Sequence, residues 1–323
     1  NGCLRDLDYA QAIQLFERSI TSEPDIPEVY NNLSTALRLD GRPSDAMVAA
    51  QRALQLNHSY GEANNNLGLA FCDLRRYPEA IRCFESAIDI DANNFEALNN
   101  LGVALDAKGD LEKSLRIFER ALILSPQNID TKINLGNLFR KIGRLDEAAA
   151  QFSEVLNYNQ ADLRAHANLG LTLITKNRPE EAIVRYEKAL ALAPETPDIR
   201  MSLGIAQLML GDFEAGWQNY EARWLAPSFA IKRRSLASEL WTGQSLEGKS
   251  ILVYAEQGFG DTIQFVPYVP MIAKQAGQVV FECQKALLRI CAKLEGVSEV
   301  VARGDFLPQT DFHIPLMSLP HRM

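Results

Sequence analysis

The chain has 323 residues, of which 47% are hydrophobic and 23% are charged, and its formal net charge is −8. This length allows two or more domains. The negative charge lies in the first 230 residues, where 32 acidic and 23 basic side chains give a net charge of −9. This balance argues against nucleic acid as the partner, because proteins that bind it present a basic face, and it favours a polypeptide.

The cysteines and the apolar runs indicate the compartment. Five cysteines without Cys-x-x-Cys spacing predict reduced thiols in a cytoplasmic protein. No apolar run is long enough to predict a membrane span, and no cluster of His and Cys predicts a metal site. The chain begins at Asn1 and stops inside an apolar segment at Met323, so we expect a fragment at both ends. The cysteines are Cys3, Cys72, Cys83, Cys283 and Cys291.

The tripeptide Asn-Leu-Gly returns at a fixed interval of 34 residues. An interval of this size predicts an array of helical repeats. Residues 1–26 form the tail of one unit, and six complete units follow up to about residue 230. The copies begin at Asn66, Asn100, Asn134 and Asn168, and diverged copies begin at Asn32 and Ser202.

Each unit contains the pattern of two helices. Positions 4, 7, 8 and 11 of the unit form an apolar stripe, which predicts the first helix. A small residue at position 20 and an aromatic residue at position 24, such as Phe118, predict a second helix packed on the first. Glycine or Asn177 at position 15 of five units, and proline at position 32 of three units, end these helices. The pattern resembles the tetratricopeptide repeat, which implies an all-α superhelix with the first helices on its concave wall.

Position 6 of five units is asparagine, namely Asn32, Asn66, Asn100, Asn134 and Asn168. We expect these side chains to face the concave groove and to bind an extended polypeptide, because an amide can bond both main-chain groups. The alternative is that each asparagine bonds local backbone or water. The array also resembles the repeats of the O-linked N-acetylglucosamine transferases, which implies an asparagine ladder that holds acceptor peptide. Acidic residues at position 2, such as Glu62, are interpreted as charges that favour the helix dipole.

The end of the array differs from the other units. All three tryptophans, Trp217, Trp224 and Trp241, lie within 25 positions, and Arg223 replaces the small residue of position 27. A terminal repeat must carry a polar cap or dock on another part of the protein, and the tryptophans favour docking. Residues 231–249 are expected to be a linker that contains a solvated basic run, Lys232-Arg233-Arg234.

From residue 250 the hydrophobic period changes from that of helices to that of strands. Apolar runs predict strands at 251–255, 279–282 and 299–302 and a fourth at 312–314, with helices at 262–275 and 285–294. Strands that alternate with helices predict a parallel sheet in a doubly wound α/β domain. His313 is as compatible with a core position at a strand end as with a ligand.

The loop after the first predicted strand, Glu256-Gln257-Gly258-Phe259-Gly260-Asp261, lies at the carboxyl edge, where such sheets bind ligands. One interpretation is a dinucleotide fold with Glu282 as the ribose acceptor, but the third glycine is absent and Ile263 stands in its place. Gly258 and Gly260 would let backbone amides approach a ligand.

The run from Gly258 to Pro267 also resembles the first loop and helix of the heptosyltransferase-type glycosyltransferases. That resemblance implies that residues 250–323 are a partial Rossmann-like domain, the first lobe of a GT-B-type enzyme. It makes Asp261 the general base, whereas a helix cap is the structural alternative. A nucleotide-sugar donor is implied for the full-length protein, and no cofactor for the fragment, which lacks the second lobe and is expected to be inactive. The rival hypothesis is a non-catalytic scaffold with a degenerate α/β domain.

Overall fold

The computed structural model describes residues 2–323, with side chains from Tyr9 onward. The chain divides into two compact units, one that extends to Thr172 and one that begins at Leu173. Within the described residues, every helix is too short or too polar to cross a membrane.

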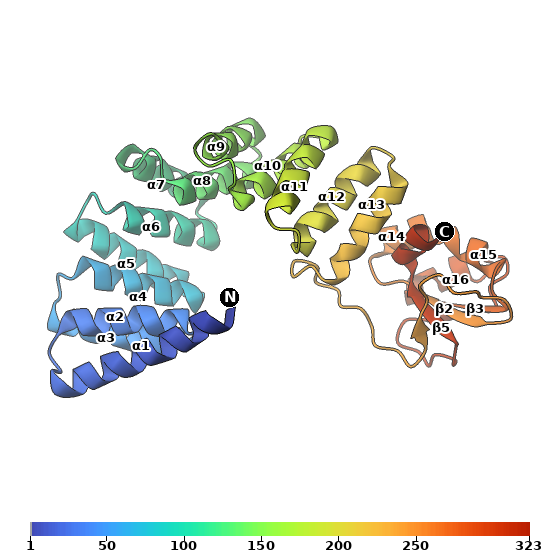
Figure 1. Ribbon diagram of the computed structural model, residues 1–323, viewed down its shortest axis with the longest axis horizontal. Coiled ribbons are helices and arrows are strands. Elements are labelled where there is room, and N and C mark those ends of the chain that lie inside the picture. Colours follow the sequence, from blue (N-terminus) through green and yellow to red (C-terminus); the bar gives the residue numbers. More distant parts are fainter. Residues whose placement is uncertain (1) are drawn as a thin grey trace. The chain divides into compact units, whose positions relative to one another are not determined.

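The first unit consists of helices that pack in consecutive pairs, and Figure 1 shows neighbouring helices side by side in antiparallel directions. Each complete repeat begins its first helix at the residue that the sequence pattern places at position 1. The helices are α1 (Gly2–Ser22), α2 (Pro27–Leu39), α3 (Pro43–Leu56), α4 (Gly61–Asp73), α5 (Tyr77–Ile90), α6 (Phe95–Lys108), α7 (Leu111–Leu124), α8 (Ile129–Lys141) and α9 (Leu145–Tyr158). The division between the units falls within α10 (Leu163–Thr175).

The two helices of a repeat approach closely because glycine faces an aromatic ring. A Cβ atom built on Gly102 of α6 would lie 2.5 Å from Cε1 of Phe118 on α7, and the Phe118 ring is buried. Gly68 faces Phe84, and Gly136 faces Phe152, in the same way. The predicted packing of the aromatic residue against the first helix is confirmed.

The turn inside each repeat uses left-handed backbone at position 15. Four glycines have φ values of +78° to +93° there, as the sequence predicted: Gly41, Gly109, Gly143 and Gly211. Asn177 takes the same conformation with φ +55°, and Arg75 does so with φ +58°. Because a side chain disfavours this conformation, the turn at Arg75 is strained.

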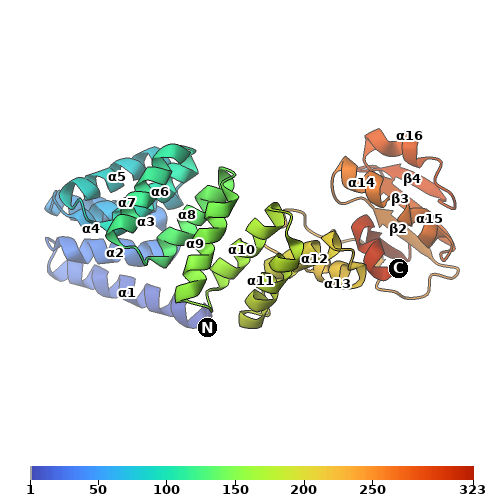
Figure 2. The ribbon, with the colours of Figure 1, turned by 90° about the horizontal axis from the view of Figure 1, so that it is seen from above.

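The second unit continues the array and then changes to a parallel sheet. Its helices and strands are α11 (Pro179–Leu192), α12 (Pro197–Met209), α13 (Phe213–Tyr220), the 3-10 turn η1 (Glu221–Trp224), β1 (Glu239–Leu240), β2 (Ser250–Tyr254), α14 (Phe259–Phe265), α15 (Tyr268–Ala273), β3 (Gln278–Cys283), η2 (Lys285–Leu287), α16 (Leu288–Cys291), β4 (Glu299–Ala302), β5 (Phe312–Pro315), η3 (Leu316–Ser318) and α17 (Leu319–Arg322). The strand order is β1-β5-β2-β3-β4, and all neighbours are parallel. Figure 2 shows α14, α15 and α16 beside these strands.

The four predicted strands are confirmed as β2, β3, β4 and β5, and so is the parallel sheet. The single helix expected at 262–275 is instead two short helices, α14 and α15, since Pro267 interrupts it. The segment expected as a linker, 231–249, contributes strand β1 and two buried side chains, Trp241 and Leu246. The indole nitrogen of Trp241 donates a hydrogen bond of 2.7 Å to the carbonyl of Gln244, which satisfies its only polar group.

The last repeat shares a hydrophobic core with the sheet. Trp217 of α13 is buried in the same cluster as Val253 and Phe281, and its ring meets Phe265 edge-on at 5.4 Å. Arg223 of η1 is completely buried, and its guanidinium carbon lies 4.6 Å from the ring centroids of both Tyr220 and Trp224. The structure confirms docking of the terminal repeat, which the tryptophans predicted.

Candidate functional site

Three of the five asparagines of position 6 form hydrogen bonds between repeats. Asn66 donates from Nδ2 to Oδ1 of Asn31 at 2.8 Å and to Oγ1 of Thr35 at 3.0 Å, so both of its amide hydrogens are engaged. Asn66 is half-buried, so the rest of its amide lies at the surface of the helix layer.

The same bond recurs in the next two units. Asn100 donates to Asn65 at 3.0 Å, and Asn134 donates to Asn99 at 3.1 Å. The hydroxyl of Thr131 also donates to Oδ1 of Asn99, at 3.1 Å. Position 6 of one repeat is therefore tied to position 5 of the preceding repeat in three consecutive steps, and we call this series the asparagine ladder.

The ladder does not include every asparagine that the sequence predicted. Asn32 is exposed and has no earlier complete repeat to bond. Asn168 lacks a partner amide because position 5 of the preceding repeat is Ile133. Among the described residues, the side chains of Asn32 and Asn168 make no ladder bond.

The acceptor side of the ladder, which was not predicted from the sequence, consists of Asn31, Asn65 and Asn99. Asn31 and Asn65 are buried, with 5% and 9% of their surface exposed. The doublet Asn-Asn, which appears in three units and stops at Ile133-Asn134, was the available signal. Only position 6 is asparagine in five units, whereas the asparagine of position 5 is limited to three.

A polar hollow of about 180 Å³ lies beside the ladder. Its lining residues are Asn31, Glu62, Asn65, Asn66, Asn94 and Glu96. Glu62 and Glu96 occupy the first turns of α4 and α6, which agrees with the dipole interpretation, and they also line this hollow. Position 2 therefore contributes to the surface that carries the asparagines.

The ladder leaves hydrogen-bonding groups available to a ligand. Oδ1 of Asn66, Asn100 and Asn134 accepts no hydrogen bond from the described residues. Asn100 and Asn134 each engage only one of two amide hydrogens. The ladder thus presents both acceptors and donors, which an extended main chain can satisfy.

The loop after β2 holds the other predicted site residues. Gly258 is the N-cap of α14 and has φ −75°, and Asp261 is the third helical residue. Oδ2 of Asp261 accepts a hydrogen bond of 3.1 Å from the backbone N–H of Gly258, so Asp261 closes the helix start without being its N-cap. A Cβ atom on Gly260 would meet nothing within 4 Å. Asp261 and Gly258 therefore lie together, and the backbone at Gly260 is open.

The crevice between the carboxyl ends of β2 and β5 is the point where the strand order reverses, and such points bind ligands in doubly wound sheets. Protein groups fill it here. Arg223 donates from Nη2 to Oγ of Ser318 at 2.8 Å and lies 3.6 Å from Oε1 of Glu256, and it also pairs with Glu221. Burial raises the pKa of Glu256 to about 7, against the opposing effect of Arg223.

Two interpretations of the basic run and of Glu282 need correction. Glu282 is buried and pairs with Arg234, so its carboxylate is not available to a ribose, and the dinucleotide interpretation loses its acceptor. The run at 232–234 is more than a solvated charge cluster, since Arg234 also lies over the ring of Tyr254 at 5.2 Å.

His313 is a buried residue of β5 whose Nδ1 is 3.2 Å from Oγ of Ser238.

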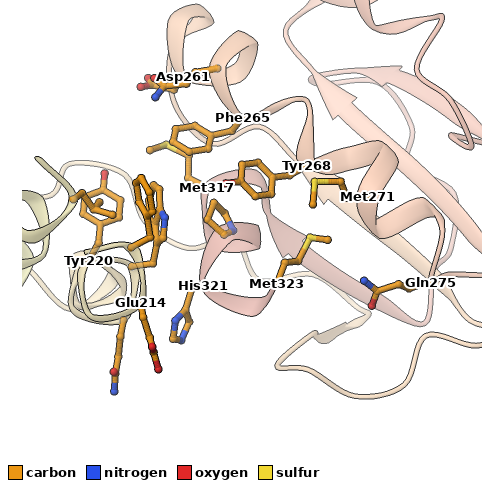
Figure 3. A pocket seen from close by; sticks show the side chains of 16 residues that line it. Glu214, Tyr220, Asp261, Phe265, Tyr268, Met271, Gln275, Met317, His321 and Met323 are labelled. Atoms are coloured by element: carbon orange, nitrogen blue, oxygen red, sulfur yellow. The ribbon is translucent and has the colours of Figure 1, made fainter. Parts of the chain in front are cut away.

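A larger hollow of about 1150 Å³ lies between α13 and the helices of the sheet. Figure 3 shows Asp261 and Gln275 at opposite ends of the labelled side chains, with Phe265, Tyr268 and Met317 between them. Aromatic and methionine side chains make up much of the wall, and polar groups stand among them. The lining residues are Leu208, Phe213, Glu214, Trp217, Gln218, Tyr220, Asp261, Gln264, Phe265, Tyr268, Met271, Gln275, Met317, Pro320, His321 and Met323.

Comparison with known families identifies the array. Models of the tetratricopeptide repeat match residues 4–62 and 65–129, residues 107–170 and residues 172–211. The chain is a tetratricopeptide-repeat protein. The matched segments together extend from residue 4 to residue 211, which includes the ladder and the hollow beside it.

A curated relative and several solved structures are similar to the repeats. Protein FlbA of Caulobacter vibrioides is 34% identical over 70 residues, which are 22% of this chain and only 12% of FlbA. The structure of pilF from Pseudomonas aeruginosa has a TM-score of 0.56 and 18% identity, and covers 62% of this chain and 92% of that chain. A tetratricopeptide-repeat protein from Parabacteroides merdae has a TM-score of 0.55 and 16% identity, with 66% and 85% covered. At these identities the solved structures establish the fold alone, and none of these matches identifies a glycosyltransferase.

Proposed function

We propose that this tetratricopeptide-repeat protein binds an extended polypeptide along the asparagine ladder, through the main chain of its partner. The observation that carries the proposal is the regular bond from position 6 to position 5 of the preceding repeat, which fixes three amides in register. Their unbonded acceptors recur once per repeat, as the main-chain N–H groups of an extended peptide recur along its length. Such contacts depend little on the side chains of the partner, so we expect little sequence preference from them.

The proposed partner is therefore a polypeptide rather than a nucleic acid or a membrane, and the acidic surface of the array supports this choice. The proposed compartment is the cytoplasm, since the cysteines with described side chains are free. The scaffold function needs nothing beyond these repeats.

The test is a titration of fluorescent extended peptides into the protein and two variants, Asn100→Ala and Asn134→Ala. Each variant should weaken binding about fivefold, the loss expected for one hydrogen bond. Asn157→Ala is the matched control, because Asn157 is an exposed asparagine on the second helix of its repeat. Equal affinities in all four proteins would reject the ladder as the binding surface.

A second candidate function adds transfer of a sugar from a nucleotide-sugar donor to the bound polypeptide. It is supported by the resemblance of residues 258–267 to glycosyltransferases and by the position of Asp261 on the wall of the hollow that adjoins the last repeat. In this proposal Asp261 would accept the proton of the acceptor hydroxyl as that oxygen attacks the anomeric carbon of the sugar. The bond from that carbon to the nucleotide diphosphate would break, and the nucleotide would leave with the bonding electron pair. Gly258 and Gly260 would let backbone amides approach the ligand.

The transfer proposal is tested in the whole protein with radiolabelled nucleotide sugars and a peptide that the repeats bind. Asp261→Asn should abolish transfer while peptide affinity is unchanged, and Asp305→Asn, an exposed loop carboxylate, is the control. Peptide binding without any transfer would leave the scaffold function and remove the catalytic one.

A further inference from the structure

Two carboxylates of the ladder surface have no cationic partner. Glu62 and Glu96 line the polar hollow, and neither forms an ion pair with any described residue. The equivalent residue of a later unit, Asp130, is neutralised by Arg164 at 2.7 Å. Two unpaired carboxylates therefore lie beside the first steps of the ladder.

The hydrogen bonds of the ladder orient the amides of Asn65 and Asn66, which lie beside these carboxylates. Asn66 uses both amide hydrogens on Asn31 and Thr35, so it offers only its Oδ1 acceptor to the hollow that it lines. Asn65 lines the same hollow and is nine-tenths buried, and its Nδ2 has no hydrogen-bond partner among the described residues. A group that enters the hollow thus meets two carboxylates and an amide acceptor, with one buried amide donor at its wall.

The charge of Glu62 also acts on its neighbour Tyr60, whose hydroxyl donates to the carboxylate at 3.3 Å. Burial and then the charge of Glu62 raise the pKa of Tyr60, and the hydroxyl remains neutral at physiological pH. None of the residues that line the hollow is basic. No cationic side chain in the lining therefore pairs with Glu62 or Glu96.

We infer that this hollow is a subsite for a lysine or arginine side chain of the polypeptide that the ladder holds. The cationic head would be bonded by Glu62, Glu96 and Oδ1 of Asn66, while Nδ2 of Asn65 would donate to a carbonyl of the partner. The volume of about 180 Å³ holds about six water molecules, which is room for one side-chain head. The inference rests on the proposed peptide binding and adds a charge preference to it.

A metal ion is a less suitable occupant. Among the residues whose side chains are described, no group of three His, Cys, Asp or Glu is placed to hold a metal. Two carboxylates from neighbouring repeats, separated by amides, match the several donors of an ammonium or guanidinium group better than the compact shell of a metal ion.

The test uses a peptide library in a Gly-Ser-Ala host with one variable position, occupied by lysine, arginine, norleucine or glutamate. The lysine and arginine peptides should bind the wild-type protein about tenfold more tightly than the norleucine peptide, and the preference should weaken as salt is added. Glu62→Gln and Glu96→Gln should each reduce the preference about threefold without changing affinity for norleucine. Glu85→Gln, which removes an exposed carboxylate from the second helix α5, is the matched control and should retain the full preference.

The outcomes separate this inference from the proposed function. Equal binding of the lysine and norleucine peptides by the wild-type protein would overturn the cation subsite and leave the ladder intact. Retention of the full preference by the double variant Glu62→Gln/Glu96→Gln would overturn it as well. Failure of every peptide to bind would instead reject the proposed function, on which the subsite depends.

Discussion

Asn100 donates a hydrogen bond of 3.0 Å to Asn65, a residue of the preceding repeat that lies 35 positions earlier in the chain. The bond fixes the amide of Asn100 relative to the preceding repeat, and Oδ1 of Asn100 accepts no hydrogen bond from the described residues. Since Asn66 and Asn134 make the equivalent bond, three acceptors are held in a regular series by the protein itself. The ladder is thus both a contact between repeats and the prepared surface of the proposed site.

Removal of a ladder bond should destabilise the array. Asn100→Ala leaves the buried Oδ1 of Asn65 without its donor, and we expect the free energy of unfolding to fall by about 1 kcal/mol. Urea denaturation followed by circular dichroism measures the change. Asn168→Ala is the control, because Asn168 makes no ladder bond, and a loss of equal size in that variant would contradict this explanation.

The effect of a glycine-to-alanine substitution in the first helices on stability should depend on the atoms that the new Cβ would meet. A Cβ atom on Gly204 would lie 2.5 Å from the backbone N of Tyr220 and 2.7 Å from the backbone O of Gly216, and neither can move without a shift of α13. Gly204→Ala should therefore destabilise the second unit by about 2 kcal/mol or more. In Gly61→Ala the nearest atom is 3.7 Å away, so that variant should be neutral or slightly more stable. Thermal unfolding of both variants tests this order.

The turn of the second complete unit offers a stabilising substitution. Arg75 adopts φ +58°, where four other units have glycine and one has asparagine. Arg75→Gly should raise the free energy of unfolding by about 1 kcal/mol, since it removes the strain of a side chain in left-handed backbone. Arg75 is exposed, so little packing is lost. A decrease in chemical-denaturation midpoint would show that the turn is not strained.

The buried carboxyl of Glu256 should make stability depend on pH. Its pKa in the folded protein, about 7, is higher than that of an unfolded glutamate, about 4.3. The folded state therefore binds the proton more tightly, and the stability that this group contributes falls as pH rises from about 4.3 to about 7. Relative to Glu256→Gln, the wild-type free energy of unfolding should fall in this window by up to about 1.4 kcal/mol per pH unit and then level off.

The measurement for Glu256 is urea denaturation at several pH values, with the difference between wild type and variant as the readout. Glu239→Gln, at an exposed position of β1, controls for the loss of one charge. Parallel pH curves for wild type and Glu256→Gln would show that the carboxyl titrates alike in the folded and unfolded chain.

Much of the array followed from the sequence because each repeat depends on local signals. The period of 34 residues, the glycines at position 15 and the aromatic residue at position 24 all act within one helix pair. The prediction that Asn66 lies in a regular row was possible for the same reason. Its acceptor Asn31 was not predicted, because a bond across 35 residues depends on the angle between repeats rather than on the pattern within one.

The contacts between the last repeat and the parallel sheet were less predictable from the sequence. The replacement of a small residue by Arg223 was visible as a break in the pattern, but its bond to Ser318 spans 95 residues and links two different kinds of structure. Strand β1 has only two residues, too few to show an alternating pattern, so the segment around Trp241 was interpreted as a linker. Burial and pairing of Glu282 with Arg234 likewise arise from tertiary contacts.

Replacement of peptide N–H groups by ester oxygens tests whether the ladder binds its partner through main-chain groups. A bound peptide is synthesised with one ester at each successive position, and the affinity of each form is measured by calorimetry with wild-type protein and with Asn100→Ala. Particular esters should weaken binding to the wild type about fivefold, and one of these losses should disappear in Asn100→Ala. Equal affinity of every ester peptide for the wild-type protein would contradict main-chain recognition by the asparagine ladder.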